Sequence, residues 1–332
     1  MNAGDPARFD LLLTGGRVID PRHRLDAVCD VAVRDGRIAA VAPDLPRANA
    51  DRVRDARGTC VVPGLVDLHT HVYRKATSYG VDTDSIAQRS AVATMVDAGS
   101  AGAGNFAGLR EFVIERARTR VLAYLNISFP GIFAFDRSVM AGEAALRELL
   151  SVDRCVEVAR ANTDVVVGIK VRLGGAVSAG VGLEALERAI DAAQAVDLPV
   201  MAHIGRPPPS YAEVVDRLRP GDVLTHCFRP APNAPVDSQR KVLPALRAAR
   251  ARGVLFDVAH GMGAFGFDSA QAAIDDGFAP DVVSSDVHAL SVFGPAYDLL
   301  HVMSKLLNCG IGFVDVIRMV SDAPARALRR DD

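Results

Sequence analysis

Short apolar runs recur between Cys60 and Ser285, and most of them are separated by amphipathic or alanine-rich stretches. The runs are typical of strands because they are short and apolar, whereas stretches such as 183–195 and 241–252 have the spacing of helices. Strands that alternate with helices favour a parallel sheet, since parallel strands need a long crossover between them. We therefore predict an α/β fold, a (β/α)8 barrel of the TIM type. The eight predicted strands are residues 60–68, 94–98, 121–127, 165–171, 199–203, 222–226, 255–258 and 282–285.

Polar side chains stand at the ends of several predicted strands. They are His69, His71, Lys170, His203, His226 and Asp286. In a barrel of this kind the reactive groups gather at the C-terminal ends of the strands, so we expect all six at one mouth. His69 and His71 are two residues apart, which on a strand puts both imidazoles on the same face.

The residue types indicate a metal site. Neutral imidazole is a good ligand for zinc, iron or nickel. Lys170 ends an apolar run, where its charged form would be costly to desolvate. A lysine is better suited to such a place if it is deprotonated and carbamylated by carbon dioxide, because the resulting carboxylate can bridge two metal ions. We interpret the six residues as a two-metal hydrolytic site.

Taken singly, several of these residues have simpler explanations. His203 and His226 could be core histidines bonded to the backbone, and Asp286 could cap the helix that follows it. Lys170 could pair with a buried carboxylate. Four separate explanations that all fall on the correct strand ends are less economical than one shared site.

The sequence VVPGLVDLHTH at 61–71 resembles the first-strand motif of the amidohydrolase superfamily. The motifs GIKVR at 168–172, AH at 202–203, THC at 225–227 and SSDVH at 284–288 resemble its dihydroorotase-like branch. Within that branch, the chain is most similar to the amidohydrolase/deacetylase metallohydrolases. The likeness runs from about residue 10 to residue 328.

The resemblance implies a cofactor of two divalent metal ions, which we expect to be zinc, and N6-carboxylation of Lys170. One ion would be held by His69, His71, Lys170 and Asp286, and the other by Lys170, His203 and His226. A hydroxide between the ions would be the nucleophile, since two cations lower the pKa of water toward neutrality. Asp286 would act as general base and then as general acid.

Three further residues are candidates for substrate binding, namely Arg172, His260 and His288. Arg172 shares the inward face with Lys170, so it could hold a substrate carboxylate through two hydrogen bonds, or pair with a carboxylate of the wall. A dihydroorotase would carry an arginine two residues after the second histidine. This chain has Tyr73 there, so that reaction is disfavoured.

Residues 1–58 read as a small antiparallel β-sheet domain, followed by the hydrolase barrel over 59–325 and a short tail at 326–332. Asp35-Gly36 between two apolar runs is a strong hairpin signal. Proteins with this resemblance usually continue with strands that complete the small sheet. Because those strands are absent here, we expect an incomplete sheet with an unpaired edge, which an oligomer could cover. We expect the glycine-rich residues 99–108 to form a flexible loop over the mouth.

The composition disfavours some classes of binding partner. The formal net charge of -2 gives no basic field for nucleic acid, and no apolar run approaches the roughly 18 residues that span a bilayer. The five cysteines show no paired spacing, which favours reduced thiols and a cytoplasmic protein. We therefore expect a small-molecule substrate as the partner, with neither nucleic acid nor membrane.

The function we predict is that of a binuclear metal-dependent hydrolase. It would cleave an amide or ester bond in a small acylated compound, such as an N-acyl amino acid or an O-acyl hydroxy acid. One alternative is a cyclic amide hydrolase of the dihydroorotase or hydantoinase kind. An alternative of another class is a non-catalytic binding or assembly subunit, which metal analysis would distinguish from an enzyme.

Overall fold

The structure is a computed structural model that describes residues 8–136 and 138–330. Its chain divides into two compact units, drawn from Met1–Pro63 with Phe313–Arg318 and from Gly64–Gly312 with Met319–Asp332. The first residues of the expected 1–58 domain and the last two of the expected 326–332 tail lie outside the described residues. In the described part of the chain, none of the helices has the length and apolarity needed to cross a membrane.

The smaller unit is built on a five-stranded sheet. Strands β1 (Leu11–Asp20), β2 (Leu25–Arg34) and β3 (Arg37–Ala42) pair antiparallel, and Asp35 and Gly36 form the β2–β3 turn with φ angles of 52° and 71°. The expectation of a purely antiparallel sheet is wrong. Strands β4 (Val53–Asp55) and β5 (Cys60–Val61) pair parallel to β1, because the segment between β3 and β4 returns the chain in the direction of β1. At the other end of the strand order, no described strand pairs with the outer edge of β3.

The larger unit contains a parallel sheet in the order β12-β11-β10-β9-β8-β7-β6. Its strands are β6 (Leu65–Thr70), β7 (Val92–Gly102), β8 (Arg120–Asn126), β9 (Val166–Leu173), β10 (Val200–Ile204), β11 (Val223–Thr225) and β12 (Leu255–Asp257). This order confirms the predicted barrel fold. Residues 282–287 close it, through single bridges from Val282 to Asp257 and from Val287 to Thr70.

The predicted eighth strand is therefore an irregular segment. Asp286 has a φ of 49°, outside the β region, so a continuous ladder cannot pass through it. The backbone amide of the preceding Ser285 donates to the side-chain Oδ1 of Asp67 on β6 at 2.9 Å instead of to a backbone carbonyl. This irregularity turns the segment where it reaches the barrel mouth.

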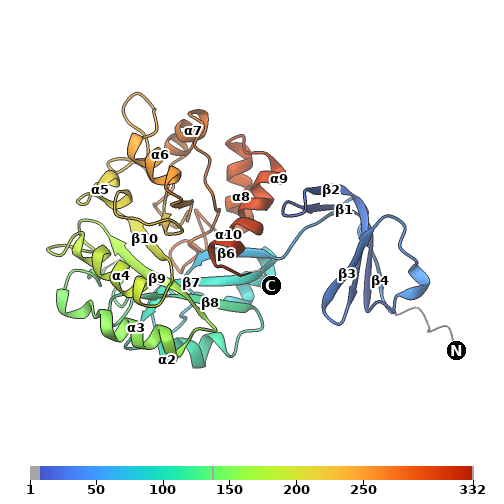
Figure 1. Cartoon of the computed structure of the whole chain (residues 1–332), viewed down its shortest axis with the longest axis horizontal. Coiled ribbons are helices and arrows are strands. Elements are labelled where there is room, and N and C mark those ends of the chain that lie inside the picture. Colours follow the sequence, from blue (N-terminus) through green and yellow to red (C-terminus); the bar gives the residue numbers. More distant parts are fainter. Residues whose placement is uncertain (1–7, 137, 331–332) are drawn as a thin grey trace. The chain divides into compact units, whose positions relative to one another are not determined.

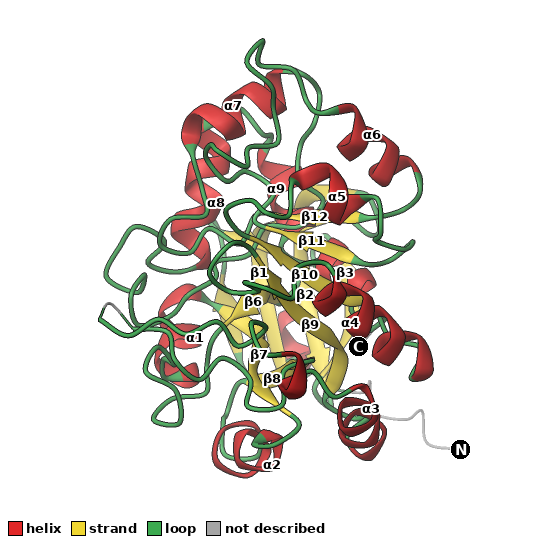
Figure 2. Cartoon of the chain, turned by 90° about the vertical axis from the view of Figure 1, so that its left-hand side faces the viewer, coloured by secondary structure: helices red, strands yellow, loops and turns green. Residues whose placement is uncertain are grey.

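Helices connect the strands and lie around the outside of the sheet (Figures 1 and 2). In the larger unit they are α1 (Thr83–Ser90), α2 (Phe106–Leu109), α3 (Val152–Ala161), α4 (Glu184–Ala195), α5 (Tyr211–Val215), α6 (Pro244–Ala251), α7 (Phe267–Asp275), α8 (Leu299–Asn308) and α10 (Asp322–Ala327). A further helix, α9 (Phe313–Met319), has all but its last residue in the smaller unit. Short 3-10 helices occupy Arg47–Asn49 and Arg147–Leu149, and a π-helix occupies Arg110–Ile114. Local signals fix several starts: Ser210 and Glu213 form a capping box at α5, and Asp298 caps α8.

A buried apolar layer lies directly before the polar strand ends in sequence. Leu68 precedes His69 by one residue, Met201 precedes His203 by two, and both belong to the main core cluster. Ala327 and Leu328, at the end of α10, pack into the same cluster. The strand ends are therefore supported by a close-packed floor, which limits the movement of the side chains above it.

Two local expectations are corrected. The first predicted strand, 60–68, is split: Cys60–Val61 belongs to the smaller sheet, and β6 begins at Leu65, because Pro63 lacks the N–H that a ladder needs. The expected flexible loop over 99–108 is also wrong, since its first residues end β7 and Phe106 begins α2.

Candidate metal centre at the mouth of the barrel

The centre of the site is a group of three buried side chains. His69 lies one residue before the end of β6, His71 lies just beyond that end, and Asp286 comes from the closing segment. Oδ1 of Asp286 lies 3.4 Å from Nε2 of His69 and 3.2 Å from Nε2 of His71. One ligand atom from each of the three lies within 4.8 Å of the others, so a single cation could contact all of them.

Lys170 reaches the same group from β9. It is fully buried, and its Nζ lies 3.4 Å from Nε2 of His69. Among the described residues it forms no ion pair with a carboxylate, which removes the simplest structural explanation for a buried lysine. Gly99, with a φ of 82°, lies against its stem, where a Cβ would come within 2.6 Å of the lysine Cβ and Cγ. The glycine predicted to serve a flexible loop therefore makes room for Lys170.

His203 and His226 complete the cluster from β10 and the end of β11. Their rings are edge to face with centroids 4.3 Å apart, and the His226 centroid is 5.2 Å from that of His69. A continuous series of contacts thus joins all six side chains that the sequence analysis singled out. His203 is half-buried, whereas His226 is buried.

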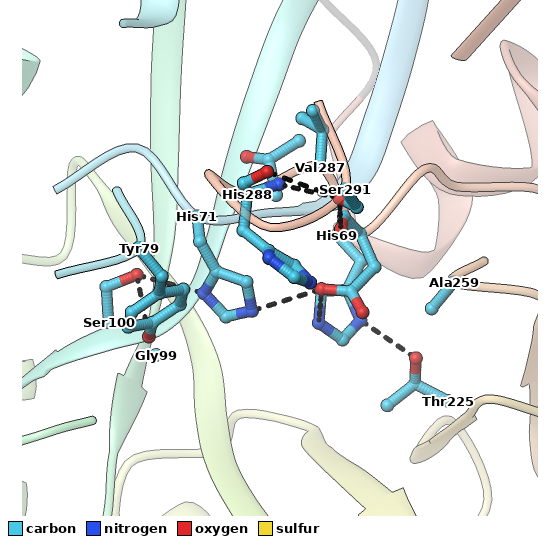
Figure 3. A network of polar contacts seen from close by, with 12 residues as sticks. His69, His71, Tyr79, Gly99, Ser100, Thr225, Ala259, Val287, His288 and Ser291 are labelled. Carbon is cyan, nitrogen blue, oxygen red and sulfur yellow. Dashed lines mark hydrogen bonds and ion pairs between the residues drawn. The ribbon is translucent and has the colours of Figure 1, made fainter. Parts of the chain in front are cut away.

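The Nδ1 atoms of His69 and His226 are fixed by hydrogen bonds. Thr225 Oγ1 donates to Asp257 at 2.9 Å, so it accepts from Nδ1 of His69 at 2.8 Å. Nδ1 of His226 donates to the carbonyl of Ala259 at 2.7 Å. Figure 3 shows Thr225 beside His69 on the side away from His71. These bonds leave Nε2 of both rings as the free ligand atom.

A comparable contact holds His71. Its Nδ1 lies 2.9 Å from Oγ of Ser100, which Figure 3 shows next to the ring. The backbone amide of Ser100 in turn donates to Asp97 at 2.7 Å, and the other oxygen of Asp97 accepts from the amide of Val72. Asp97 therefore ties the ends of β6 and β7 together directly behind His71.

Burial decides the charge state of the cluster. It lowers the pKa of His71 to about 3 and holds the pKa values of His69, His203 and His226 well below their usual range. Burial also lowers the pKa of Lys170 to about 7. In the same way it raises the pKa of Asp286 to about 6. The imidazoles are thus neutral near pH 7, the form that coordinates metals.

The donor set fits divalent cations. Neutral imidazoles and a carboxylate meet in one buried place, and nitrogen and oxygen donors of this kind are the ligands that such cations prefer. Zinc is compatible with nitrogen and oxygen ligands of this kind.

Arg172 lies two residues beyond Lys170 and is buried beside the cluster. Its Nη1 is 3.3 Å from a carboxylate oxygen of the buried Glu143, and its guanidinium lies over the Phe135 ring at 4.9 Å. The wall-carboxylate alternative is thus the arrangement observed. Glu143 and Phe135 both come from the irregular segment between β8 and α3, which carries no periodic signal that sequence reasoning could use.

His288 and His260 lie on other sides of the mouth. His288 contacts the rings of His71, Tyr79 and Phe135, and its Nδ1 accepts the amide of Leu290 at 3.2 Å. Both ring nitrogens of His260 are engaged: Nδ1 donates to the Gly261 carbonyl at 2.9 Å, and Nε2 accepts from Lys305 at 2.8 Å.

Tyr73 stands at the position where a dihydroorotase would carry an arginine, and neither Tyr73 nor the adjacent Arg74 bonds to the cluster. The Tyr73 hydroxyl donates to the carbonyl of Asn105 at 3.1 Å, and the exposed Arg74 pairs with Asp82 at 2.8 Å. Asp67, Asp97, Ser100 and Asp257 support the site but were missed as functional candidates. The three acids carry a usable signal, because each is an acid within or at the end of an apolar run.

A barrel that gathers imidazoles, a lysine and a carboxylate at one mouth defines the class of TIM-barrel hydrolases with a metal-ligand cluster. A family model for the amidohydrolase family matches residues 60–332. A deacetylase from Brucella anthropi is 35% identical over 333 residues, which cover 99% of this chain and 81% of that protein. The chain therefore belongs to the amidohydrolase family, and it is a hydrolase that acts on carbon–nitrogen bonds.

Two solved structures of related proteins share the fold. The crystal structure of a dihydroorotase has a TM-score of 0.87 at 33% identity, covering 97% of this chain and 83% of that one. The crystal structure of an adenine deaminase has a TM-score of 0.88 at 31% identity, covering 97% and 85%. Relatives with different substrates thus share this barrel, so the substrate must be argued from the site.

Proposed function

We propose that the protein is a binuclear metal-dependent deacylase that cleaves an amide or ester bond in a small acylated compound. An N-acyl amino acid or an O-acyl hydroxy acid is the substrate class we favour. The observation that carries the proposal is the buried lysine within 3.4 Å of a histidine in the His69, His71 and Asp286 group. The similarity to a protein named deacetylase along nearly the whole chain supports the same reaction.

We assign two roles to these residues, that of metal ligand and that of general base and acid. His69, His71, Lys170, His203, His226 and Asp286 would hold two divalent ions, with Lys170 carboxylated. Bound divalent ions supply two things, acidification of water and polarisation of the scissile carbonyl. A lysine pKa near 7 favours carboxylation, since the neutral amine is the form that adds to carbon dioxide and releases a proton.

Asp286 is positioned to move the proton. Its carboxylate lies against both His69 and His71, and burial raises its pKa to about 6, close to the pH at which a general base and acid is most effective. It would accept a proton from the attacking water and return it to the leaving nitrogen or oxygen. No other described residue is needed for this transfer.

The three candidates for substrate binding are assigned different roles. Because Nδ1 of His288 accepts a backbone amide, its Nε2 carries the proton and can donate to a substrate oxygen. Arg172, balanced by Glu143, would donate to a second oxygen and shape the wall. His260 is fully engaged, so we assign it a positioning role: it holds Gly261, which lies against Asp286.

Hydrolysis of a cyclic amide is the second candidate. It is supported by the similarity to a dihydroorotase structure and opposed by Tyr73, whose buried ring occupies the position where an arginine would be expected. A non-catalytic binding subunit is disfavoured, since all six cluster residues are present and in contact.

The test is metal analysis combined with a substrate screen. We expect the wild-type protein to bind about two divalent ions per chain and to hydrolyse N-acyl or O-acyl acids. Lys170→Ala should lose metal, and kcat/KM should fall by at least about 100-fold, with partial recovery in added short carboxylic acids. Lys241→Ala, which removes an exposed lysine paired with Asp276, is the matched control and should change neither property. Unchanged metal content in Lys170→Ala would refute the bridging role.

A further inference from the structure

Arg229 lies at the barrel mouth beside the histidine pair. It follows His226 by three residues, and its Nη1 donates to the carbonyl of Ile204 at 2.9 Å. Ile204 is the residue directly after His203, at the end of β10. The guanidinium is thus held at the rim next to the strand that carries His203.

One donor atom of Arg229 has no hydrogen-bond partner within the described part of the chain. Among the described residues it forms no ion pair with a carboxylate, and its Nε is buried without any hydrogen-bond partner. Arg172, in contrast, has Glu143 against it. The residue as a whole is half-buried, but a buried N–H donor without an acceptor is costly. An anion bound at the mouth would supply the missing acceptor.

The surroundings of Arg229 are rigid and positively charged. The side chain of Asn233 ties residues 205–211 to residues 227–233: its Nδ2 donates to the carbonyls of Gly205 and Pro209, and its Oδ1 accepts the amide of Tyr211. The hydroxyl of Tyr211 donates back to the carbonyl of Cys227 at 2.9 Å. Burial lowers the pKa of Arg229, and repulsion by the exposed Arg206, which lies in the first of these segments, acts in the same direction. Loops fixed in advance lose little entropy when a ligand binds.

We propose that Arg229 binds the carboxylate of the acylated substrate and is the residue that selects anionic over neutral substrates. The inference rests on the proposed deacylase function. A planar guanidinium accommodates a carboxylate through two parallel hydrogen bonds, and its free Nε edge is suited to this geometry. The acyl group would extend from Arg229 past His203 toward Asp286, while Arg172, already paired, would contribute less to charge selection.

The experiment compares kcat/KM for N-acetyl amino acids with kcat/KM for the corresponding N-acetyl amino acid amides. The wild-type protein should prefer the acid. Arg229→Gln and Arg229→Met should lower kcat/KM for the acid by about 10- to 100-fold, the size of a charge-assisted contact. For the amide, kcat/KM of both variants should stay within about twofold of the wild-type value. Arg229→Met keeps the apolar stem and removes the unsatisfied donor, so it is suited to fold even if the glutamine variant is not. Arg217→Gln, a surface arginine paired with Glu187, removes the same charge and should leave the ratio unchanged.

If Arg229 had only a structural role, its substitution would lower kcat/KM for the acid and for the amide by the same factor. The ratio of the two kcat/KM values would then be unchanged, and that result would overturn the inference. N-methanesulfonylglycine carries the carboxylate but no scissile amide, so its binding tests Arg229 separately from catalysis. Isothermal titration should show that it binds the wild-type protein more tightly than its primary amide does, and that this preference disappears in Arg229→Met. If no acyl compound is hydrolysed but the preference depends on Arg229, the proposed function fails and the anion site stands. If hydrolysis is observed and the preference is independent of Arg229, only the anion site fails.

Discussion

Gly261→Ala should disable the site by displacing Asp286. A Cβ built on Gly261 would lie 2.2 Å from Oδ2 of Asp286 and 3.1 Å from its Cγ, whereas ordinary contacts begin at 3.4 Å. The carboxylate would have to move by about 1 Å, and a misplacement of this size can cost on the order of 100-fold in rate. That corresponds to about 2.8 kcal/mol of transition-state stabilisation. The φ of Gly261 is 55°, so alanine would also add backbone strain of about 1–2 kcal/mol to the folded state.

Two glycine variants separate these effects. Gly310 has a φ of 91° and no atom within 4 Å of an added Cβ, so Gly310→Ala carries the backbone strain without a clash. Gly263 has neither a left-handed φ nor a neighbour within 4 Å, so Gly263→Ala should behave as wild type. The assays are metal content after dialysis, kcat/KM on an N-acyl substrate and urea unfolding. If Gly261→Ala matched Gly310→Ala in metal content and kcat/KM, the assigned contact between Gly261 and Asp286 would be wrong.

Two further predictions concern the support of His69 and the buried thiol. Thr225→Val removes the hydroxyl between His69 and Asp257, so the metal dissociation constant should rise by about 10- to 100-fold. Thr225→Ser keeps the hydroxyl, and its dissociation constant should stay near that of the wild type. Equal metal affinities for the valine and serine variants would contradict the assignment of the His69 tautomer. Burial raises the pKa of Cys155 from 9.0 to about 12, so an unfolded chain ionises this thiol before the folded one does. The native state should therefore lose stability as pH rises above 9, by about 1 kcal/mol per pH unit from this group. Urea unfolding at pH 8 and pH 10 should show a smaller loss in Cys155→Ala, and an identical loss in both proteins would count against the assignment.

The sequence was sufficient for the parts of the molecule that follow a local rule. Apolar runs alternating with amphipathic stretches predict the barrel, because burial of one strand and one helix face at a time determines the layers. The positions of His69, Lys170 and Asp286 after such runs predict that they meet, since parallel strands end at one mouth. No contact had to be known for either conclusion.

The tertiary structure decided what depends on the paths of loops. Glu143 lies in an irregular segment, so nothing in its neighbourhood along the chain indicates that it neutralises Arg172. The absence of such a partner for Arg229 is equally invisible in the sequence, because it is a property of everything packed around the side chain.

The same distinction explains the errors along the backbone. Whether Cys60–Val61 joins the barrel or the small sheet depends on which edge lies within hydrogen-bonding reach after the chain turns, and its apolar character suits both. Asp286 leaves the β region, with a φ of 49°, in a segment where the amide of Ser285 is held by the side chain of Asp67 from another strand. Periodicity determines which face of an element is buried, whereas only the assembled fold determines which charge finds a partner.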